Sequence, residues 1–156
     1  SVVFRQPGDA EQFVNQALLA QEAGTELPFA IVDRRNEKVI GSTRFLNISR
    51  KDRGLEIGFT WLTPSVWKTP VNTECKWLLL RHCFETLGCI RVQLKTDARN
   101  LNSQRAIQRI GGVREGVLRN HMIVRDGYIR DSVYFSILDR EWPAVKKKLQ
   151  LLLFGE

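Results

Sequence analysis

Apolar residues follow two different spacings along this chain, and the spacing changes from segment to segment. Leu55, Ile57 and Phe59 alternate with polar or small residues, which is typical of a strand with one buried face. Leu80 and Phe84 lie four residues apart, which is typical of one face of a helix. The pattern predicts, in chain order, a helix over 9–24, strands over 29–32, 38–46 and 55–61, a helix over 73–87, a strand over 90–95, a helix that ends at Gly111, strands over 117–124 and 128–138, and a final helix from Pro143.

The middle of this order decides the fold class. A strand, a long helix and a second strand in succession fit a right-handed parallel crossover. The flanking strands fit antiparallel hairpins, and the clearest hairpin turn is Asp126-Gly127. We therefore predict one domain of the α/β (α+β) class over residues 1–156, in which a mixed, mostly antiparallel sheet contains one parallel crossover and has helices on both faces.

Length and composition agree with a single globular domain. The chain has 156 residues, of which 43% are hydrophobic and 26% charged. No apolar stretch approaches the roughly 20 residues that a membrane-spanning helix needs. Three cysteines without CxxC spacing and two histidines predict neither a disulfide framework nor a metal site. We expect Cys75 and Cys83 to be buried hydrophobic residues, and free thiols favour a cytoplasmic location.

The positive charge is confined to the second part of the chain. Residues 1–66 contain 8 basic and 8 acidic side chains, whereas residues 67–156 contain 16 basic and 9 acidic ones, so that the net charge of +7 arises after Val66. Such an excess favours a polyanionic partner, which by charge alone is a nucleic acid, a membrane surface or a phosphorylated cofactor.

The segment that joins the third strand to the long helix is a candidate anion site. Ligands of open α/β sheets bind where the carboxyl end of a strand faces the start of the next helix. The free amides and the dipole of that helix attract an anion, to which Lys68, Thr69 and Thr73 would add donors. The alternative is an ordinary loop in which Asn72 or Thr73 caps the helix.

The ordered combination of these motifs resembles a known family. The block 56–64, the loop through Trp67, the helix followed by Gly88-Cys89, the strand 90–95 and the Asn100-Leu101-Asn102-Ser103 motif are similar to the GNAT superfamily of acyl-CoA N-acyltransferases. The closest resemblance is to its RimJ/RimL-like branch, which acetylates amines including ribosomal-protein N-termini. The likeness extends from about Pro28 to Trp142.

This resemblance implies that acetyl-CoA enters a V-shaped opening between the third and fourth strands. The family's pyrophosphate loop, Gln/Arg-x-x-Gly-x-Gly/Ala, falls on Trp67, Pro70 and Asn72, and none of the three matches it. Pro70 donates no amide proton, so Lys68, Arg105 and Arg109 are expected to compensate. The positions expected to contact acetyl-CoA, through main chain or side chain, are Trp61, Leu62, Lys68, Thr69, Val71, Asn72, Thr73, Asn100, Ser103 and Arg105.

Several residues are candidates for the chemistry that the resemblance implies. Transfer to an amine needs a neutral nucleophile and a proton for the departing thiolate. Glu56 is the candidate base, acting through water, and its alternative role is a cross-strand partner of an arginine. His121 is a second candidate base with a structural alternative, and Tyr134 is a weaker candidate for the acid. Ser103 would contact the leaving thiol, and Asn100 reads equally as a pantetheine contact and as a helix N-cap.

The leading functional hypothesis is an acetyl-CoA-dependent N-acetyltransferase. It would transfer acetyl directly to a primary amine on a protein N-terminus, such as that of a ribosomal protein, or on a small molecule. The alternatives are a catalytically degenerate CoA-binding regulator and a basic RNA- or ribosome-binding module. Nucleic acid is disfavoured because no RNP-like motif or zinc knuckle accompanies the charge. Homodimers are common in the family, no membrane partner is expected, and residues 1–4 leave little room for its usual first strand.

Overall fold

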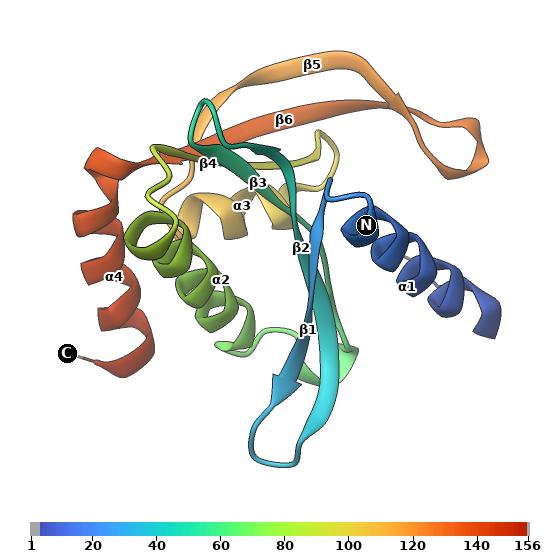
Figure 1. Ribbon diagram of the computed structural model, residues 1–156, viewed down its shortest axis with the longest axis horizontal. Helices are drawn as coiled ribbons and strands as arrows, with labels where there is room; N and C mark the ends of the chain where they lie inside the picture. Colours follow the sequence, from blue (N-terminus) through green and yellow to red (C-terminus); the bar gives the residue numbers. More distant parts are fainter. Residues whose placement is uncertain (1–3, 156) are drawn as a thin grey trace.

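The computed structural model describes residues 4–155, and its centre is a six-stranded sheet (Figure 1). The helices are α1 (Pro7–Glu22), α2 (Val71–Arg81), α3 (Leu101–Arg109) and α4 (Trp142–Phe154), and the strands are β1 (Leu27–Asp33), β2 (Lys38–Ser49), β3 (Gly54–Leu62), β4 (Arg91–Asp97), β5 (Val113–Ile123) and β6 (Ile129–Leu138). The strand order is β1-β2-β3-β4-β6-β5. The predicted order of helices and strands is confirmed.

The parallel crossover lies in the middle of the sheet. β3 and β4 pair in parallel from Gly54 opposite Arg91 to Glu56 opposite Gln93, while the neighbouring strand pairs are antiparallel. Beyond Glu56 the two strands continue without pairing to each other, because β3 runs on to Leu62 and β4 to Asp97. The predicted mixed sheet is therefore confirmed, and it opens between β3 and β4 at their carboxyl ends.

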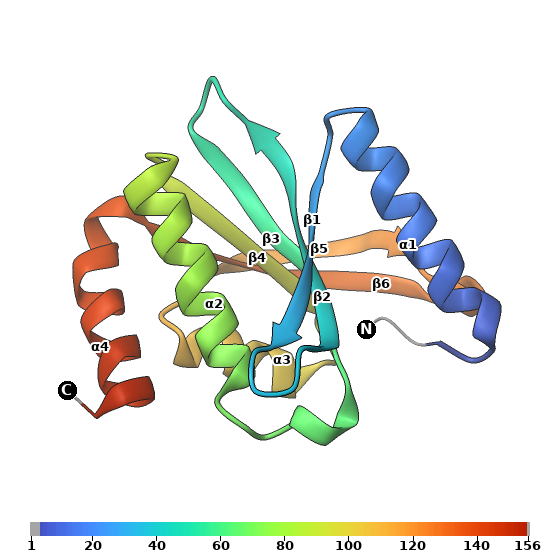
Figure 2. The same ribbon diagram turned by 60° about the horizontal axis from the view of Figure 1, so that its bottom comes forward.

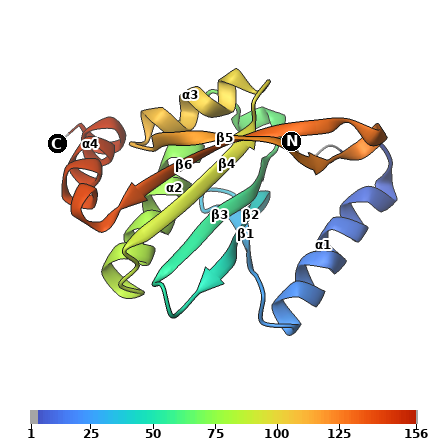
Figure 3. The same cartoon turned by 90° about the horizontal axis from the view of Figure 1, so that it is seen from above.

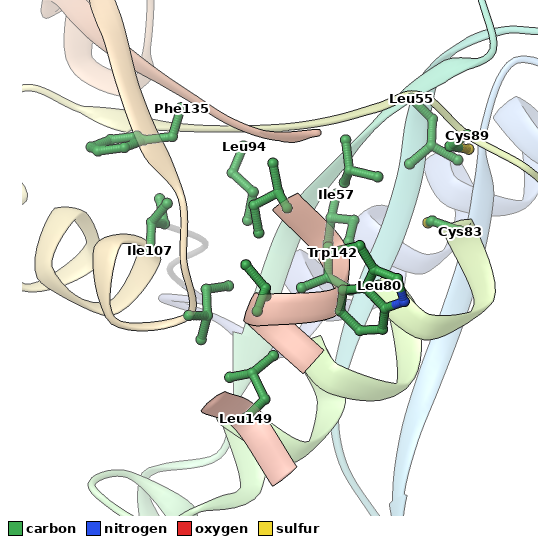
Figure 4. Packing of buried hydrophobic residues seen from close by; sticks show 14 of the residues in the cluster. Leu55, Ile57, Leu80, Cys83, Cys89, Leu94, Ile107, Phe135, Trp142 and Leu149 are labelled. Atoms are coloured by element: carbon green, nitrogen blue, oxygen red, sulfur yellow. The ribbon is translucent and has the colours of Figure 1, made fainter. Parts of the chain in front are cut away.

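Helices cover both faces of the sheet, and the two faces differ in character. α2 and α4 lie side by side on one face, where a hydrophobic core joins them to the sheet (Figures 2 and 4). Phe45 belongs to this core, whereas its neighbour Arg44 points to the other face. There the Arg44 guanidinium lies 4.4 Å from the ring centres of Phe13 in α1 and Phe59 in β3. α1 therefore covers the face opposite α2 and α4 (Figure 3).

Some predicted ends of helices and strands are wrong. α2 begins at Val71, with Pro70 at the N-cap position, so the expected caps Asn72 and Thr73 lie inside the first turn. Proline suits this place because the amide it lacks has no partner at a helix start. α1 begins at Pro7, two residues before the predicted start at Asp9, and the Asp9 carboxylate accepts the amide protons of Arg5 and Gln6. The expected position of a first strand falls partly on residues 1–3, which lie outside the described chain.

No helix within residues 4–155 combines the length and the apolar character that crossing a bilayer demands. The longest one, α1, has 16 residues and carries charged side chains at both of its ends.

Substituting Gly41 tests how closely β2 and β3 approach each other beside the opening. A Cβ at this position would overlap the Trp61 carbonyl oxygen and lie 2.9 Å from a methyl of Leu62. Because the obstacle is backbone, we expect Gly41→Ala to lower the free energy of unfolding by about 1–3 kcal/mol, measured by chemical denaturation. Gly116→Ala in β5, where a Cβ meets nothing within 4 Å, is the control. Equal denaturation midpoints for the two variants would contradict this packing.

Candidate functional site

The opening between β3 and β4 exposes main-chain groups of β3. The Thr63 amide donates to the Ile40 carbonyl of β2 at 2.8 Å. The main-chain N–H and C=O groups of successive strand residues point to opposite sides, so those of Trp61 also point to β2 and those of Leu62 point to the opening. The Leu62 carbonyl accepts the indole N–H of Trp67 at 2.8 Å. Of the two residues expected to bind pantetheine through their main chain, Leu62 is thus the one that faces the opening.

The loop after β3 forms tight local hydrogen bonds and leads to the start of α2. The Thr69 hydroxyl donates to the Val66 carbonyl at 2.6 Å, and Lys68 is exposed with a left-handed φ of 61°. The amides of Asn72 and Thr73 have no acceptor within the described chain, since the first helical acceptor, the Pro70 carbonyl, takes the amide proton of Glu74. The start of α2 therefore offers open N–H donors.

A basic side chain of α3 reaches the same helix start. Arg109 donates to the hydroxyl of the buried Thr73 at 2.9 Å, and Arg105 lies exposed one turn earlier on α3. Together with Lys68 and the open amides, these groups are the donors that a diphosphate requires. The residues present therefore fit the phosphate-bearing end of acetyl-CoA, although Pro70 removes one donor that the family pattern has.

The Asn-x-x-Ser motif forms the first turn of α3, directly after β4. The Asn100 side chain accepts the Ser103 amide proton at 3.0 Å, so Asn100 is the N-cap of α3 and this alternative is confirmed. Ser103 is half-buried. Its contact with the leaving thiol stays a prediction.

Glu56 lies on the face opposite the core and is 1% exposed. One carboxylate oxygen accepts hydrogen bonds from Asn47 at 2.8 Å and Gln93 at 2.9 Å, and the other lies 3.1 Å from the ammonium of Lys95. The structure thus shows the cross-strand alternative, with lysine in place of the expected arginine. A carboxylate enclosed by three donors is poorly placed to take a proton from a bound amine.

His121 belongs to a hydrogen-bonded group on the same face of the sheet as Glu56, opposite the core, which we call the polar face. Its Nδ1 lies 2.9 Å from the Ser132 hydroxyl, which also accepts from Arg130, and its Nε2 lies 3.3 Å from the Tyr134 hydroxyl. Tyr134 stands directly opposite Lys95 in the β4–β6 register, so the two side chains share a face. The structure therefore brings His121 and Tyr134 onto the same face as the Glu56–Lys95 pair. A hollow of about 810 Å³ beside them is lined by Val117, Leu118, Arg119, Asn120, His121 and Asp131.

Lys76 is a further polar residue at the opening that sequence reasoning missed. It is 6% exposed on α2, and its ammonium donates to the Thr60 hydroxyl at 2.6 Å. Burial lowers the pKa of Lys76 to about 8. Helical spacing could have indicated that Lys76 is buried, because it lies three residues after Thr73 and four before Leu80, on the buried side of α2.

The cysteines are buried thiols. Cys83 and Cys89 are buried, and Cys75 is partly so. Burial raises the pKa of each thiol, which suppresses the reactive thiolate. The buried hydrophobic role expected for Cys83 is confirmed by its place in the core, whereas Cys75 is only partly buried and lies outside that core. Within residues 4–155, no three His, Cys, Asp or Glu side chains are grouped to hold a metal ion.

Comparison with known proteins connects this geometry to a family. A family model described as "Acetyltransferase (GNAT) domain" matches residues 3–113, more than half of the chain. The chain belongs to the GNAT acetyltransferases. Among GNAT structures, that of a GCN5-related N-acetyltransferase from Brucella melitensis superposes with a TM-score of 0.85 at 32% identity, over 94% of this chain and 64% of that one.

Curated relatives also carry N-acetyltransferase names. The chain is 27% identical over 137 residues to p20 of Bacillus licheniformis, named an uncharacterized N-acetyltransferase; the match covers 88% of this chain and 74% of p20. It is 32% identical over 100 residues to YdaF of Bacillus subtilis, provisionally named a ribosomal N-acetyltransferase; this match covers 64% of this chain and 54% of YdaF. The superfamily resemblance is therefore confirmed, and YdaF supports the RimJ/RimL-like branch.

Proposed function

We propose that this protein is an N-acetyltransferase that moves the acetyl group of acetyl-CoA directly to a primary amine. The observation that carries the proposal is the opening between β3 and β4, next to a helix start with open amides, in a chain of the GNAT family. When bound, acetyl-CoA supplies the acetyl group as an activated thioester.

The donor side of the site would use groups from three elements. The Leu62 main chain at the opening would hold the pantetheine arm, while Lys68, Arg109 and the first amides of α2 would hold the phosphates. Thr69, Val71 and Asn72 would contribute from the loop and the first helical turn, and Arg105 from α3. Holding donor and acceptor together lowers the entropic cost of the reaction.

The acceptor side would lie on the polar face. With its ring proton on Nδ1, His121 donates to Ser132 and accepts the Tyr134 hydroxyl proton at Nε2. This arrangement gives Tyr134 and His121 a path along which the proton of the attacking amine would leave. Glu56, enclosed by its donors, would then act as a positioning residue that holds Lys95 and the start of the opening.

The acceptor class follows from the family and from the named relatives. A primary amine is the acceptor that an N-acetyltransferase requires. Because YdaF is named a ribosomal N-acetyltransferase, the N-terminal amine of a ribosomal protein is the first acceptor to test. Small-molecule amines form the second class.

Calorimetric titration of the full chain with acetyl-CoA tests the proposal. We expect saturable binding below high micromolar concentrations, followed by acetylation of at least one amine in a panel of N-terminal peptides, lysine, polyamines and amino sugars. Absence of acetyl-CoA binding would reject the proposal. Binding without transfer to any amine would indicate a CoA-binding regulator, and salt-dependent RNA affinity without CoA binding would indicate an RNA-binding module.

A further inference from the structure

The buried side of α2 changes from polar to apolar along the helix, and the change coincides with the opening in the sheet. Thr73 and Lys76 occupy the first turns of this side, and Leu80 and Cys83 continue it. Lys76 reaches Thr60, which is past the last β3–β4 pair, whereas Leu80 and Cys83 belong to the core with Leu55, whose strand is still paired to β4. The polar part of α2 therefore lies against the open part of the sheet.

The position of Thr60 connects Lys76 with the opening. β3 carries a bulge here, since Phe59 has a left-handed φ of 50° and the β2–β3 register shifts between Ser42 and Arg44. By strand alternation with Trp61, the main chain of Thr60 faces the opening as that of Leu62 does. The amine of Lys76, at 2.6 Å from the Thr60 hydroxyl, therefore lies beside whatever pairs with this stretch of β3.

The hydrogen bonding of Lys76 is incomplete without a ligand. The Thr60 hydroxyl is its single acceptor among the described residues, and Thr60 in turn lies 3.0 Å from the Thr43 hydroxyl, which donates to the Gly58 carbonyl. A protonated amine carries three N–H donors, so two of them find no acceptor among the protein groups of residues 4–155. A buried donor without an acceptor is costly, which makes an unpaired lysine at this depth unusual.

No charged group of the protein compensates Lys76. Within residues 4–155 no carboxylate forms an ion pair with Lys76, and the neighbouring Cys75 thiol, whose pKa is raised by burial, is uncharged at neutral pH. Of the neighbouring elements, β3 presents Thr60, and α3 presents the cationic Arg109 one turn away at Thr73. The buried side chains of α4 are the uncharged Trp142, Val145 and Leu149.

We propose that Lys76 is a ligand-contact residue, whose Nζ donates to a carbonyl oxygen of the pantetheine arm of acetyl-CoA. This inference rests on the proposed function, because it requires the arm to lie in the opening. The arm contains two amide carbonyls, which are the type of acceptor that the Lys76 amine lacks. An arm that follows β3 would carry these carbonyls past Thr60.

Binding of acetyl-CoA would change the protonation of Lys76. A carbonyl acceptor favours the ammonium over the neutral amine, so binding raises the pKa of Lys76 from its lowered value near 8. We therefore expect the complex to take up a fraction of a proton at about pH 8.5, which lies above the lowered pKa of Lys76 in the free protein. The phosphates of acetyl-CoA are fully ionised at this pH and its sulfur is acylated, so the ligand itself contributes no uptake.

Calorimetry of the full chain at about pH 8.5, in two buffers of different ionisation enthalpy, tests both consequences. We expect proton uptake by the wild type, and about 10- to 100-fold weaker acetyl-CoA binding by Lys76→Met, without uptake. Adenosine 3′,5′-bisphosphate, which lacks the arm, should bind both proteins equally. Lys147→Met on the exposed side of α4 is the matched control and should behave as wild type in every titration.

The outcomes separate this inference from the proposed function. Wild-type protein that fails to bind acetyl-CoA overturns the proposed function. Wild-type binding without proton uptake, or unchanged acetyl-CoA affinity in Lys76→Met, overturns the pantetheine contact alone. Equal weakening of the bisphosphate also overturns it, because Lys76 would then act on the phosphates. The proton measurement on wild-type protein holds even if Lys76→Met fails to fold.

Discussion

Replacing His121 by glutamine is expected to lower kcat by about 100-fold or more, with little change in the affinity for acetyl-CoA. His121 lies within hydrogen-bond distance of Tyr134 on the polar face, away from the loop and α2 groups that would hold the phosphates. Glutamine can keep a hydrogen bond to Ser132 or Tyr134, but it cannot accept a proton at neutral pH. Steady-state kinetics with an amine that the wild type acetylates measures the effect, and calorimetry measures acetyl-CoA binding.

Two further variants decide whether this loss is catalytic. Tyr134→Phe keeps the ring and removes the hydroxyl, so a proton path through both residues predicts a loss of similar size. The matched control is His82→Gln. His82 is the only other histidine of the chain and lies exposed directly after α2, with its ring stacked on Phe45 at 6.4 Å. Full turnover in His121→Gln, or an equal loss in His82→Gln, would remove His121 from the mechanism.

Replacing Glu56 by alanine is expected to lower the free energy of unfolding by about 3–5 kcal/mol. The carboxylate is 1% exposed and receives hydrogen bonds from Asn47 and Gln93, while Lys95 is paired with it at 18% side-chain exposure. Its removal leaves a largely buried ammonium and two amide groups without their acceptor, at the point where β3 and β4 separate. Urea denaturation followed by circular dichroism measures the loss.

A double-mutant cycle with Lys95→Ala isolates the ion pair. We expect the double variant to be less destabilised than the sum of the two single variants, because removal of both charges leaves no unpaired ion. Asp126→Asn is the control, since its partner Arg5 and Asp126 are both largely exposed and the turn conformation at Asp126 suits asparagine. A loss in Glu56→Ala no larger than in Asp126→Asn would show that Glu56 does not hold the strands together.

Much of the fold could be predicted because its signals are local. Alternation identified β3, the Asp126-Gly127 turn identified the β5–β6 hairpin, and the N-cap was one of the two roles expected for Asn100. The predicted start of α2 at Thr73 was wrong for a local reason also. Asn72 and Thr73, the alternative caps, are good cap residues, but Pro70 permits the helix to begin earlier. Motif order, which depends on sequence alone, was sufficient to indicate the GNAT family.

The candidate site was predicted less completely. The sequence indicated the loop after β3 and the start of α2, since these follow from the crossover. It proposed Glu56 as a base, because a carboxylate on that strand has the right chemistry. The enclosure of Glu56 by Asn47, Gln93 and Lys95 depends on three strands lying in one register, which no local pattern specifies.

The sequence by itself therefore determined the order of helices and strands, the parallel crossover and the family, and it singled out the loop after β3 that we propose holds the acyl donor. Only the tertiary structure decided which side chains meet: Lys76 with Thr60, His121 with Tyr134, and Arg109 with Thr73. These partners are 16, 13 and 36 residues apart. Hydrophobic periodicity shows which face of a helix or strand is buried, but the rotation of α2 under the opening and the register of β5 on β6 arise from packing of the whole core.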